Sequence, residues 1–252
     1  MGAISDRAVR SVFRRLFLIQ GCWNYEGMQN VGFAYAILPA LREIWAGRPN
    51  DAIRSVKRHL EFFNTHPVMS AVVLGAGVRL EEKAAAGECD TADVGAFKMG
   101  WMGSLGAIGD AFFWGSLRPM ASVAGVLLAL VHPLIGIAAM LILYNAAHLS
   151  ICGSGFKAGL SGQEAAVVWL KEKSLNVKTN NLKAAVSVLG GVYAGIFISA
   201  TAAAGATPPN AVVIFLVCAG VIWFVTEMFR KSISSSGILL FLLLTGVLIL
   251  CR

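Results

Sequence analysis

The sequence predicts an all-α, polytopic membrane protein, and three observations lead to this fold class. Of the 252 residues, 57% are hydrophobic and only 14% are charged, a balance typical of membrane proteins. Three long stretches, residues 119–156, 184–226 and 232–251, contain no Asp, Glu, Lys or Arg. Since a spanning helix needs about 20 apolar residues, each stretch can hold one. Polar residues interrupt the other apolar segments, so we expect about four to five crossings together with broken, re-entrant and amphipathic helices.

We expect one membrane domain over residues 1–252, divided into three parts by charge and hydropathy. Residues 1–15 form a basic amphipathic arm, and residues 16–119 form a half with broken helices. Residues 120–252 hold the C-terminal spans, together with a lysine-rich cytoplasmic loop at 152–183.

The N-terminal 44 residues combine the arm with an apolar segment that has a polar centre. Ser5 is placed to cap a short helix, which lies on the cytoplasmic membrane face or forms the first turn of a longer helix. Residues 16–44 are long enough to cross the bilayer, and Pro39 bends or ends the segment. Its polar centre is unsuited to lipid, so it is buried among helices or enters and leaves on one side.

The middle of the chain predicts one amphipathic helix and two short apolar arms. Residues 51–63 suit the amphipathic helix, with Asp51 at its start. Residues 67–78 are too short to span and suit a re-entrant arm, and residues 94–114 form a second, glycine-rich arm. Two discontinuous segments of this kind point to a transport site near the midplane of the membrane.

The C-terminal half predicts complete spans. Residues 120–147 form a hydrophobic span that His132 and Pro133 are expected to kink, and residues 162–173 suit an amphipathic helix. Further spans are expected at residues 184–204, 211–229 and 237–251.

Loop charges predict the orientation of the chain. The N-terminal arm and residues 152–183 are basic, whereas residues 205–210 carry no charge. Because Lys and Arg collect in cytoplasmic loops, we expect the N-terminus in the cytoplasm and the C-terminus outside. An even number of crossings must then precede residue 152, so the span at 120–147 needs one partner, most simply residues 16–41.

The rest of the chain is organised around residues 95–119, an apolar block that carries six glycines, the acid Asp110 and the base Arg118. Within it, GSLGAIGDAFFWGSLRP at residues 103–119 resembles the signature of the IID membrane subunit of the mannose-family sugar phosphotransferase system. Two earlier stretches match as well: LFLIQGCWNYEGMQNVGFAYAILPAL at residues 16–41 and RHLEFFNTHP at residues 58–67. The resemblance covers about the first half of the chain.

The resemblance implies a subunit that is not catalytic by itself and needs no cofactor. It would join a IIC partner in the bacterial inner membrane, among membrane lipids, to form the uptake pathway for a mannose-type hexose or amino sugar. The IIA and IIB phosphocarriers would transfer the phosphoryl group, and the complex would be a trimer of IIC–IID pairs. The family also has a longer segment where this chain has only residues 205–210.

Candidate sugar contacts are planar polar side chains, which bridge neighbouring hydroxyls, and aromatic faces, which cover the C–H surface of the ring. Structural roles compete: Asp110 could cap a half-helix or pair with Arg118, and Asn64 with Thr65 could form a turn. The substrate-binding candidates are Glu26, Gln29, Asn64, Thr65, Asp110 and Trp114.

Several other functions find no support in the sequence. The five cysteines lack metal-ligand or disulfide spacing, and no nucleotide-binding loop or paired-carboxylate motif is present, so neither a metal nor a catalytic residue is predicted. The net charge of +7 fits cytoplasmic loops better than nucleic acid, because no basic patch with interleaved aromatic residues accompanies it. Two alternatives stay open: an autonomous secondary transporter or channel outside the phosphotransferase system, and a membrane scaffold or receptor.

Overall fold

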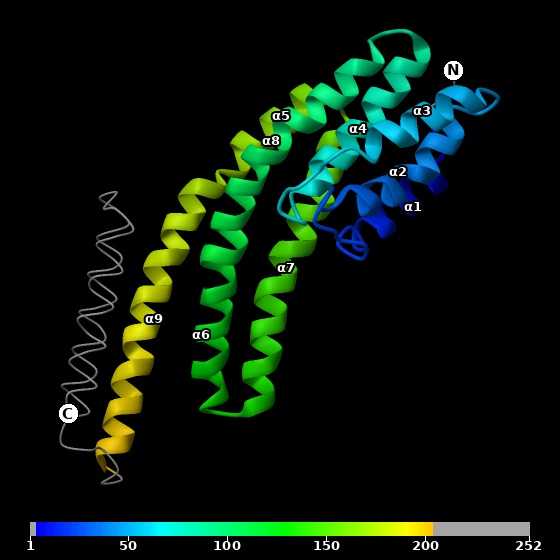
Figure 1. The fold of residues 1–252 in the computed structure, drawn as a ribbon. Helices are drawn as coiled ribbons and strands as arrows, with labels where there is room; N and C mark the ends of the chain where they lie inside the picture. Colours follow the sequence, from blue (N-terminus) through cyan, green and yellow to red (C-terminus); the bar gives the residue numbers. More distant parts are fainter. Residues whose placement is uncertain (1–3, 204–252) are drawn as a thin grey trace, which may run out of the picture. The chain divides into compact units, whose positions relative to one another are not determined.

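The computed structural model describes residues 4–203, and the predicted all-α fold class is confirmed there (Figure 1). This part of the chain contains no β-strand, only two isolated bridges, Asn24 with Met28 and Met28 with Phe63. Residues 4–190 belong to one compact unit, described below by itself. The helical elements are α1 (Asp6–Leu16), α2 (Asn30–Ile44), α3 (Pro49–His59), α4 (Ser70–Ala86), α5 (Thr91–Gly109), the π-helix η1 (Asp110–Leu117), α6 (Arg118–Ala129), α7 (Pro133–Leu160), α8 (Gln163–Lys173) and α9 (Leu175–Ala203).

The amphipathic arm forms helix α1. Ser5 is its N-cap, as expected, with the side chain accepting a hydrogen bond from the Ala8 amide at 3.1 Å. Asp6 in the first turn and arginines in the last turn complement the helix dipole. The apolar stripe packs against α2 and α4, and Val12 and Leu16 are buried. Protein rather than lipid therefore covers the centre of this stripe.

The predicted crossing at residues 16–44 is wrong. Helix α1 ends at Leu16, residues 17–29 form turns, and α2 has only 15 residues, about 22 Å in length and too short for the hydrocarbon core. The polar residues of this segment lie in the turns, where side chains and backbone satisfy one another: the Asn24 side chain accepts a hydrogen bond from the Gly27 amide at 2.7 Å. Pro39 lies inside α2 without ending it.

The two re-entrant arms are also wrong. Helix α4 continues past the predicted end at residue 78 to Ala86, and Gly87 ends it in a left-handed conformation. Elements α5, η1 and α6 form one continuous helix, Thr91–Ala129, of 39 residues. Its glycines permit close packing rather than a break: a Cβ at Gly109 would overlap the His66 side chain.

The single span expected at residues 120–147 is wrong: this stretch contains the end of one helix, a turn and the start of a second helix, which together form a helical hairpin. Helix α6 ends at Ala129, and His132 caps α7 by accepting a hydrogen bond from the Leu134 amide at 3.3 Å. Pro133 occupies the first turn of α7, where its fixed φ favours helix initiation, so it starts a helix instead of kinking one. Gly125 and Gly136 let α6 and α7 approach closely.

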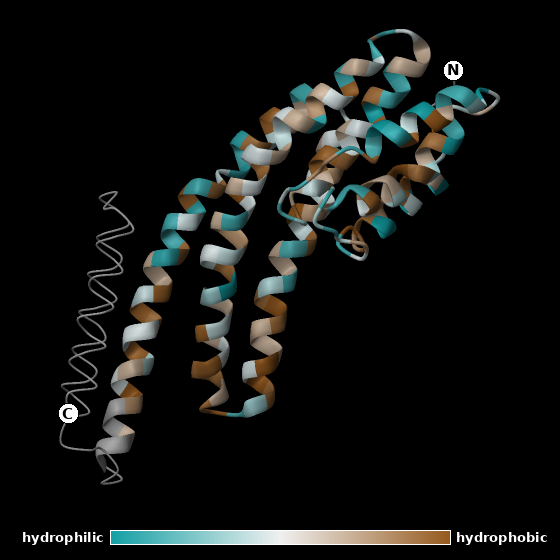
Figure 2. Ribbon diagram, in the orientation of Figure 1, coloured by the Kyte–Doolittle hydropathy of each residue, from teal (hydrophilic) through white to brown (hydrophobic). Residues whose placement is uncertain are grey.

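Two helices among the described residues, Thr91–Ala129 and Pro133–Leu160, are long and apolar enough to cross a membrane. Hydrophobic residues predominate toward the turn that joins them (Figure 2). Near this turn Val131 is 78% exposed and Leu134 is 69% exposed, as expected for side chains in contact with lipid. The longer helix extends about 58 Å, so only part of it lies within the hydrocarbon.

The remaining predicted elements agree with the structure where it describes them. Helix α3 begins two residues before Asp51 and ends at His59, and α8 matches the amphipathic helix predicted at residues 162–173. Helix α9 covers the described part of the span at residues 184–204. The spans predicted at residues 211–229 and 237–251 lie outside the described residues.

Candidate functional site

A cavity of about 350 Å³ lies between three segments that are distant in sequence: the turns before α2, the loop after α3, and one face of α5 and η1. Five of the six predicted sugar contacts line it, Glu26 being the exception. A larger cavity of about 800 Å³, between α4, α5 and the start of α8, contains none of them. The residues lining the smaller cavity are Gln20, Trp23, Gln29, Asn64, Thr65, Pro67, Met102, Gly103, Gly106, Ala107, Asp110 and Trp114.

Gln29 fixes the backbone beside the cavity. Its side chain is buried, and its amide nitrogen donates to the Thr65 carbonyl at 2.8 Å while its amide oxygen accepts from the Thr65 amide at 3.2 Å. The Gln29 backbone amide also donates to the Phe63 carbonyl at 2.9 Å. Since both ends of the carboxamide are engaged, Gln29 holds the loop that carries Asn64.

Asn64 and Thr65 present unused polar groups at this loop. Asn64 is exposed, and its side-chain carboxamide makes no hydrogen bond with the described residues. Its neighbours Phe63 and Thr65 are buried, and their backbone groups are hydrogen-bonded. The Thr65 hydroxyl is buried without a hydrogen-bond partner. A fixed backbone with free polar side chains is preorganised to bind a ligand, because little conformational entropy is lost on binding.

The opposite wall contains the π-helix η1, which begins at Asp110. The Ser116 hydroxyl donates to the Ala111 carbonyl, five residues earlier, at 2.8 Å and so closes the wider turn. Asp110 and Trp114 are both exposed and line the cavity from the same side. Short π-helical segments occur often at functional sites, and nothing in the sequence pattern indicated this one.

Arg118 contacts the aromatic ring of Trp114 rather than Asp110. Its guanidinium lies 5.3 Å from the ring centroid, and no ion pair joins it to Asp110 in the part of the chain that the structure describes. The proposed Asp110–Arg118 pair is therefore not formed. The Asp110 carboxylate is left free to accept hydrogen bonds in the cavity.

His66 lies behind the loop and is held as a neutral ring. It stacks on Phe113 with 4.8 Å between ring centroids, and its Nδ1 accepts from the Val68 amide at 3.3 Å, which places the proton on Nε2. Burial lowers the pKa of His66 to about 4. The buried Nε2 has no hydrogen-bond partner. His66 thus supports the site as a flat, uncharged ring beside Trp114, at 5.1 Å between ring centroids.

Glu26 lies outside the cavity, exposed on the turn before α2. Sequence reasoning missed Gln20, Trp23 and Met102, which do line it. Trp23 could have been found, because an aromatic residue beside a polar cluster is the combination that sugars require. The sequence does not indicate that Met102 lines the cavity, since its position there follows from the packing of α5. Within residues 4–203 no group of three or more acidic, His or Cys side chains is arranged to hold a metal.

Comparison with known proteins identifies similar chains. A family model described as "PTS system mannose/fructose/sorbose family IID component" matches residues 3–251. The mannose-specific EIID component of Escherichia coli K12 is 38% identical over 159 residues, which are 63% of this chain and 56% of that protein. The sorbose-specific EIID component of Lacticaseibacillus casei is 33% identical over 181 residues, 71% of this chain and 62% of that protein. Both alignments thus span less than two thirds of the relative's length.

Two solved structures resemble the fold along almost its whole length. One, described as the mannose transporter ManYZ in complex with microcin E492, matches with a TM-score of 0.62 and 26% identity, covering 98% of this chain and 96% of that chain. Another, described as a membrane protein, matches with a TM-score of 0.71 and 28% identity over the same shares.

Proposed function

We propose, since this chain belongs to the mannose/fructose/sorbose family of IID components of the sugar phosphotransferase system, that it is a non-catalytic permease subunit for sugar uptake. In this proposal a IIC partner completes the pathway, and IIB, charged by IIA, phosphorylates the sugar on the cytoplasmic side. The observation that carries the proposal is the cavity, in which a free carboxylate, a free carboxamide and an aromatic face meet.

The chemistry of the cavity fits a monosaccharide. The Asp110 carboxylate accepts hydrogen bonds from neighbouring hydroxyls, and the Asn64 carboxamide both donates and accepts. The Trp114 ring covers an apolar C–H face of the sugar. A volume of about 350 Å³ is at the lower end for ligand pockets, which favours a single hexose or amino sugar over a longer saccharide.

A IIC partner is proposed because large aromatic side chains are exposed on the turns before α2 and on α2 itself. Tyr25 is 87% exposed, and Trp23 and Tyr35 are each more than 40% exposed. Aromatic side chains of this kind are enriched where protein partners pack. The ManYZ name of one structural neighbour is consistent with such a pairing, and we extend the proposal to a trimer of IIC–IID pairs.

The two spanning helices support an inner-membrane topology with the N-terminus in the cytoplasm. Thr91–Ala129 and Pro133–Leu160 cross in opposite directions, so α1 and α8 lie on the same side of the membrane. Helix α1 carries four arginines and the last turn of α8 carries Lys171 and Lys173, which favours the cytoplasm. This proposal keeps the even number of crossings that the loop charges predict, although different helices supply them.

Cysteine labelling tests this orientation. On a cysteine-free background, a membrane-impermeant reagent is expected to label a cysteine at position 208 in intact cells and to miss one at position 173, since basic segments stay inside. Permeabilised cells serve as the control, because both positions should then react. Labelling of position 173 in intact cells would reverse the proposed orientation.

Co-expression tests the proposed function. With the IIC, IIB and IIA subunits, we expect uptake and phosphorylation of at least one member of a hexose and amino-sugar panel. Omitting IIC should abolish uptake, because in this proposal IIC supplies the rest of the pathway through which the sugar crosses. Sugar transport by this chain alone in liposomes would contradict the proposal and favour an autonomous transporter.

A further inference from the structure

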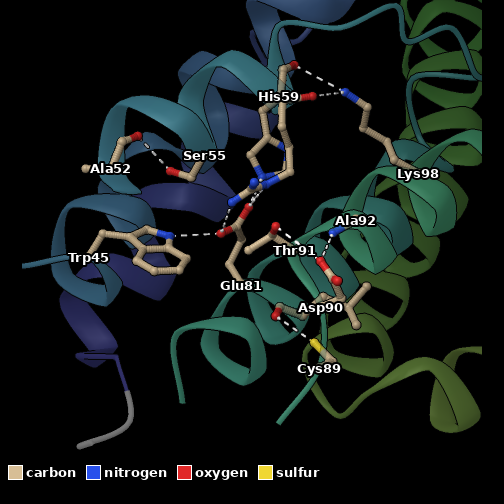
Figure 3. Close-up of polar contacts among 12 residues, drawn as sticks. Trp45, Ala52, Ser55, His59, Glu81, Cys89, Asp90, Thr91, Ala92 and Lys98 are labelled. Carbon is tan, nitrogen blue, oxygen red and sulfur yellow. Dashed lines mark hydrogen bonds and ion pairs between the residues drawn. The ribbon is translucent and has the colours of Figure 1, made fainter. Parts of the chain in front are cut away.

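Lys98 is a buried lysine whose ammonium is bound entirely by backbone carbonyls. Only 2% of the residue is exposed, and Nζ donates to the carbonyls of Arg58, His59 and Glu61 at 3.0, 3.4 and 3.3 Å. Figure 3 shows the Lys98 side chain pointing toward the backbone at His59. The ammonium also lies 5.5 Å from the ring centroid of Phe33, close enough for a cation–π contact. No other helix of residues 4–190 receives a buried lysine at its C-terminal end.

These carbonyls belong to the end of α3 and the loop that follows it. The last carbonyls of a helix have no partner within the helix and carry partial negative charge, so a cation beside them is stabilising. Lys98 provides that cation from α5 rather than from α3 itself. It therefore acts as a C-terminal cap that joins two elements.

The side chains at the end of α3 are fixed from the other direction by Glu81 of α4. Its carboxylate accepts from the Arg58 Nε at 2.8 Å and from the His59 Nε2 at 2.9 Å (Figure 3). Lys98 thus binds the backbone carbonyls of Arg58 and His59, while Glu81 binds their side chains. The loop begins from a rigid point only five residues before Asn64.

Lys98 also occupies a defined position relative to the cavity. It lies one helical turn before Met102, which lines the cavity, on the same continuous helix as Asp110 and Trp114. The loop that it holds carries Asn64 and Thr65 on the facing wall. Lys98 therefore connects α5, which forms one wall of the cavity, to the start of the loop that forms the facing wall.

We propose that Lys98 is a positioning residue that sets the separation of the two cavity walls and thereby the affinity for the sugar. This inference rests on the proposed function, because it assigns the cavity to sugar binding. It differs from a purely structural role in one respect: the loss should appear in apparent affinity within correctly assembled complexes, and not only in their yield.

The test compares Lys98→Met and Lys98→Arg in the assembled complex with its IIC and IIB partners. Met keeps the length of the side chain but donates no hydrogen bonds, so we expect KM for the sugar to rise about tenfold, equivalent to about 1.4 kcal/mol, with the maximal rate per complex nearly unchanged. Arg retains a charged donor, and KM should stay within about threefold of wild type. Lys57→Met, at an exposed lysine of α3, removes the same charge and should match wild type.

Hydrogen exchange in the sugar-free complex tests the positioning without relying on transport. Lys98→Met should accelerate amide exchange over residues 60–66 while exchange in α1 stays unchanged. Faster exchange with an unchanged KM would overturn the link to the site and leave the proposed function intact. Unchanged exchange would overturn the positioning role itself. If Lys98→Met fails to assemble, KM and amide exchange are measured instead for Lys98→Gln, whose side chain keeps an uncharged hydrogen-bond donor.

Discussion

Glu81→Ala is expected to lower the free energy of unfolding by about 3–5 kcal/mol, because it breaks a buried ionic network and leaves its partners unpaired. Glu81 is completely buried in α4. Beyond its bonds to Arg58 and His59, its carboxylate accepts from the Trp45 indole at 2.8 Å, so one side chain joins α4 to α3 and to the end of α2. Without it, the N–H groups of all three partners remain buried without an acceptor.

Denaturant unfolding in mixed micelles measures this loss, with Glu88→Ala as the control. Glu88 is an exposed carboxylate just after α4, and its removal should change stability by no more than about 0.5 kcal/mol. Glu81→Gln should fall between the two variants, since an amide keeps an acceptor oxygen but loses the charge. A Glu81→Ala protein as stable as the Glu88→Ala protein would show that the network contributes nothing net.

The pH dependence gives the same prediction a second signature. Burial by itself raises the pKa of Glu81, but hydrogen bonds from His59 and Arg58 outweigh it and hold the pKa at about 2, below the ordinary value of 4.5. A lowered carboxyl pKa contributes stability above pH 4.5 that is lost as the pH falls toward 2. Wild type should therefore lose stability in this window, and Glu81→Ala should lose less of it.

His59 also makes the protein less stable as the pH falls, but in a higher pH range than Glu81. Burial lowers its pKa from 6.5, so the ring is neutral, donates from Nε2 to Glu81 and leaves Nδ1 as an unprotonated atom without a partner. Protonation would bury a charge and an unpaired donor. Its contribution is present above pH 6.5 and declines as the pH falls below that value.

Local patterns in the sequence predicted the short amphipathic helices and most of the cavity. Helices α1, α3 and α8 follow from caps and periodicity within a few residues, so they could be found without knowledge of their neighbours. The free polar groups of Asn64 and Asp110 stood out because polar residues are costly in an apolar setting. Because that argument depends on composition alone, it holds even where the helices are wrongly assigned.

The crossings could not be predicted in the same way. Hydropathy counts apolar residues but does not distinguish a helix buried by protein, such as α4, from one that crosses lipid, and both are glycine- and alanine-rich here. The role of Pro133 was ambiguous because a proline can either kink a helix or begin one. Only the presence of a turn directly before it shows that it begins a helix. Lys98 and Glu81 carried no local signal, since their partners lie far away in sequence.

Asp110→Asn is expected to weaken apparent sugar affinity about ten- to a hundredfold in the assembled complex. The substitution preserves the volume of the side chain but removes a charge, and the loss of one charge-assisted hydrogen bond costs about 1.5–3 kcal/mol. Assembly should be unaffected, because Asp110 is exposed and forms no ion pair with Arg118 in the described residues. Trp114→Phe should cost less than Asp110→Asn, since an aromatic face remains.

Glu26→Gln provides the matched control for this measurement. It makes the same chemical change at a carboxylate that the sequence also suggested for the site, but the structure places Glu26 outside the cavity. Uptake kinetics and the yield of complex should both stay at wild-type values for Glu26→Gln, whereas Asp110→Asn should alter KM alone. If assembled Asp110→Asn binds sugar normally, Asp110 is not a sugar contact. If Glu26→Gln loses affinity instead, the sugar lies against the turn before α2 and not in the cavity.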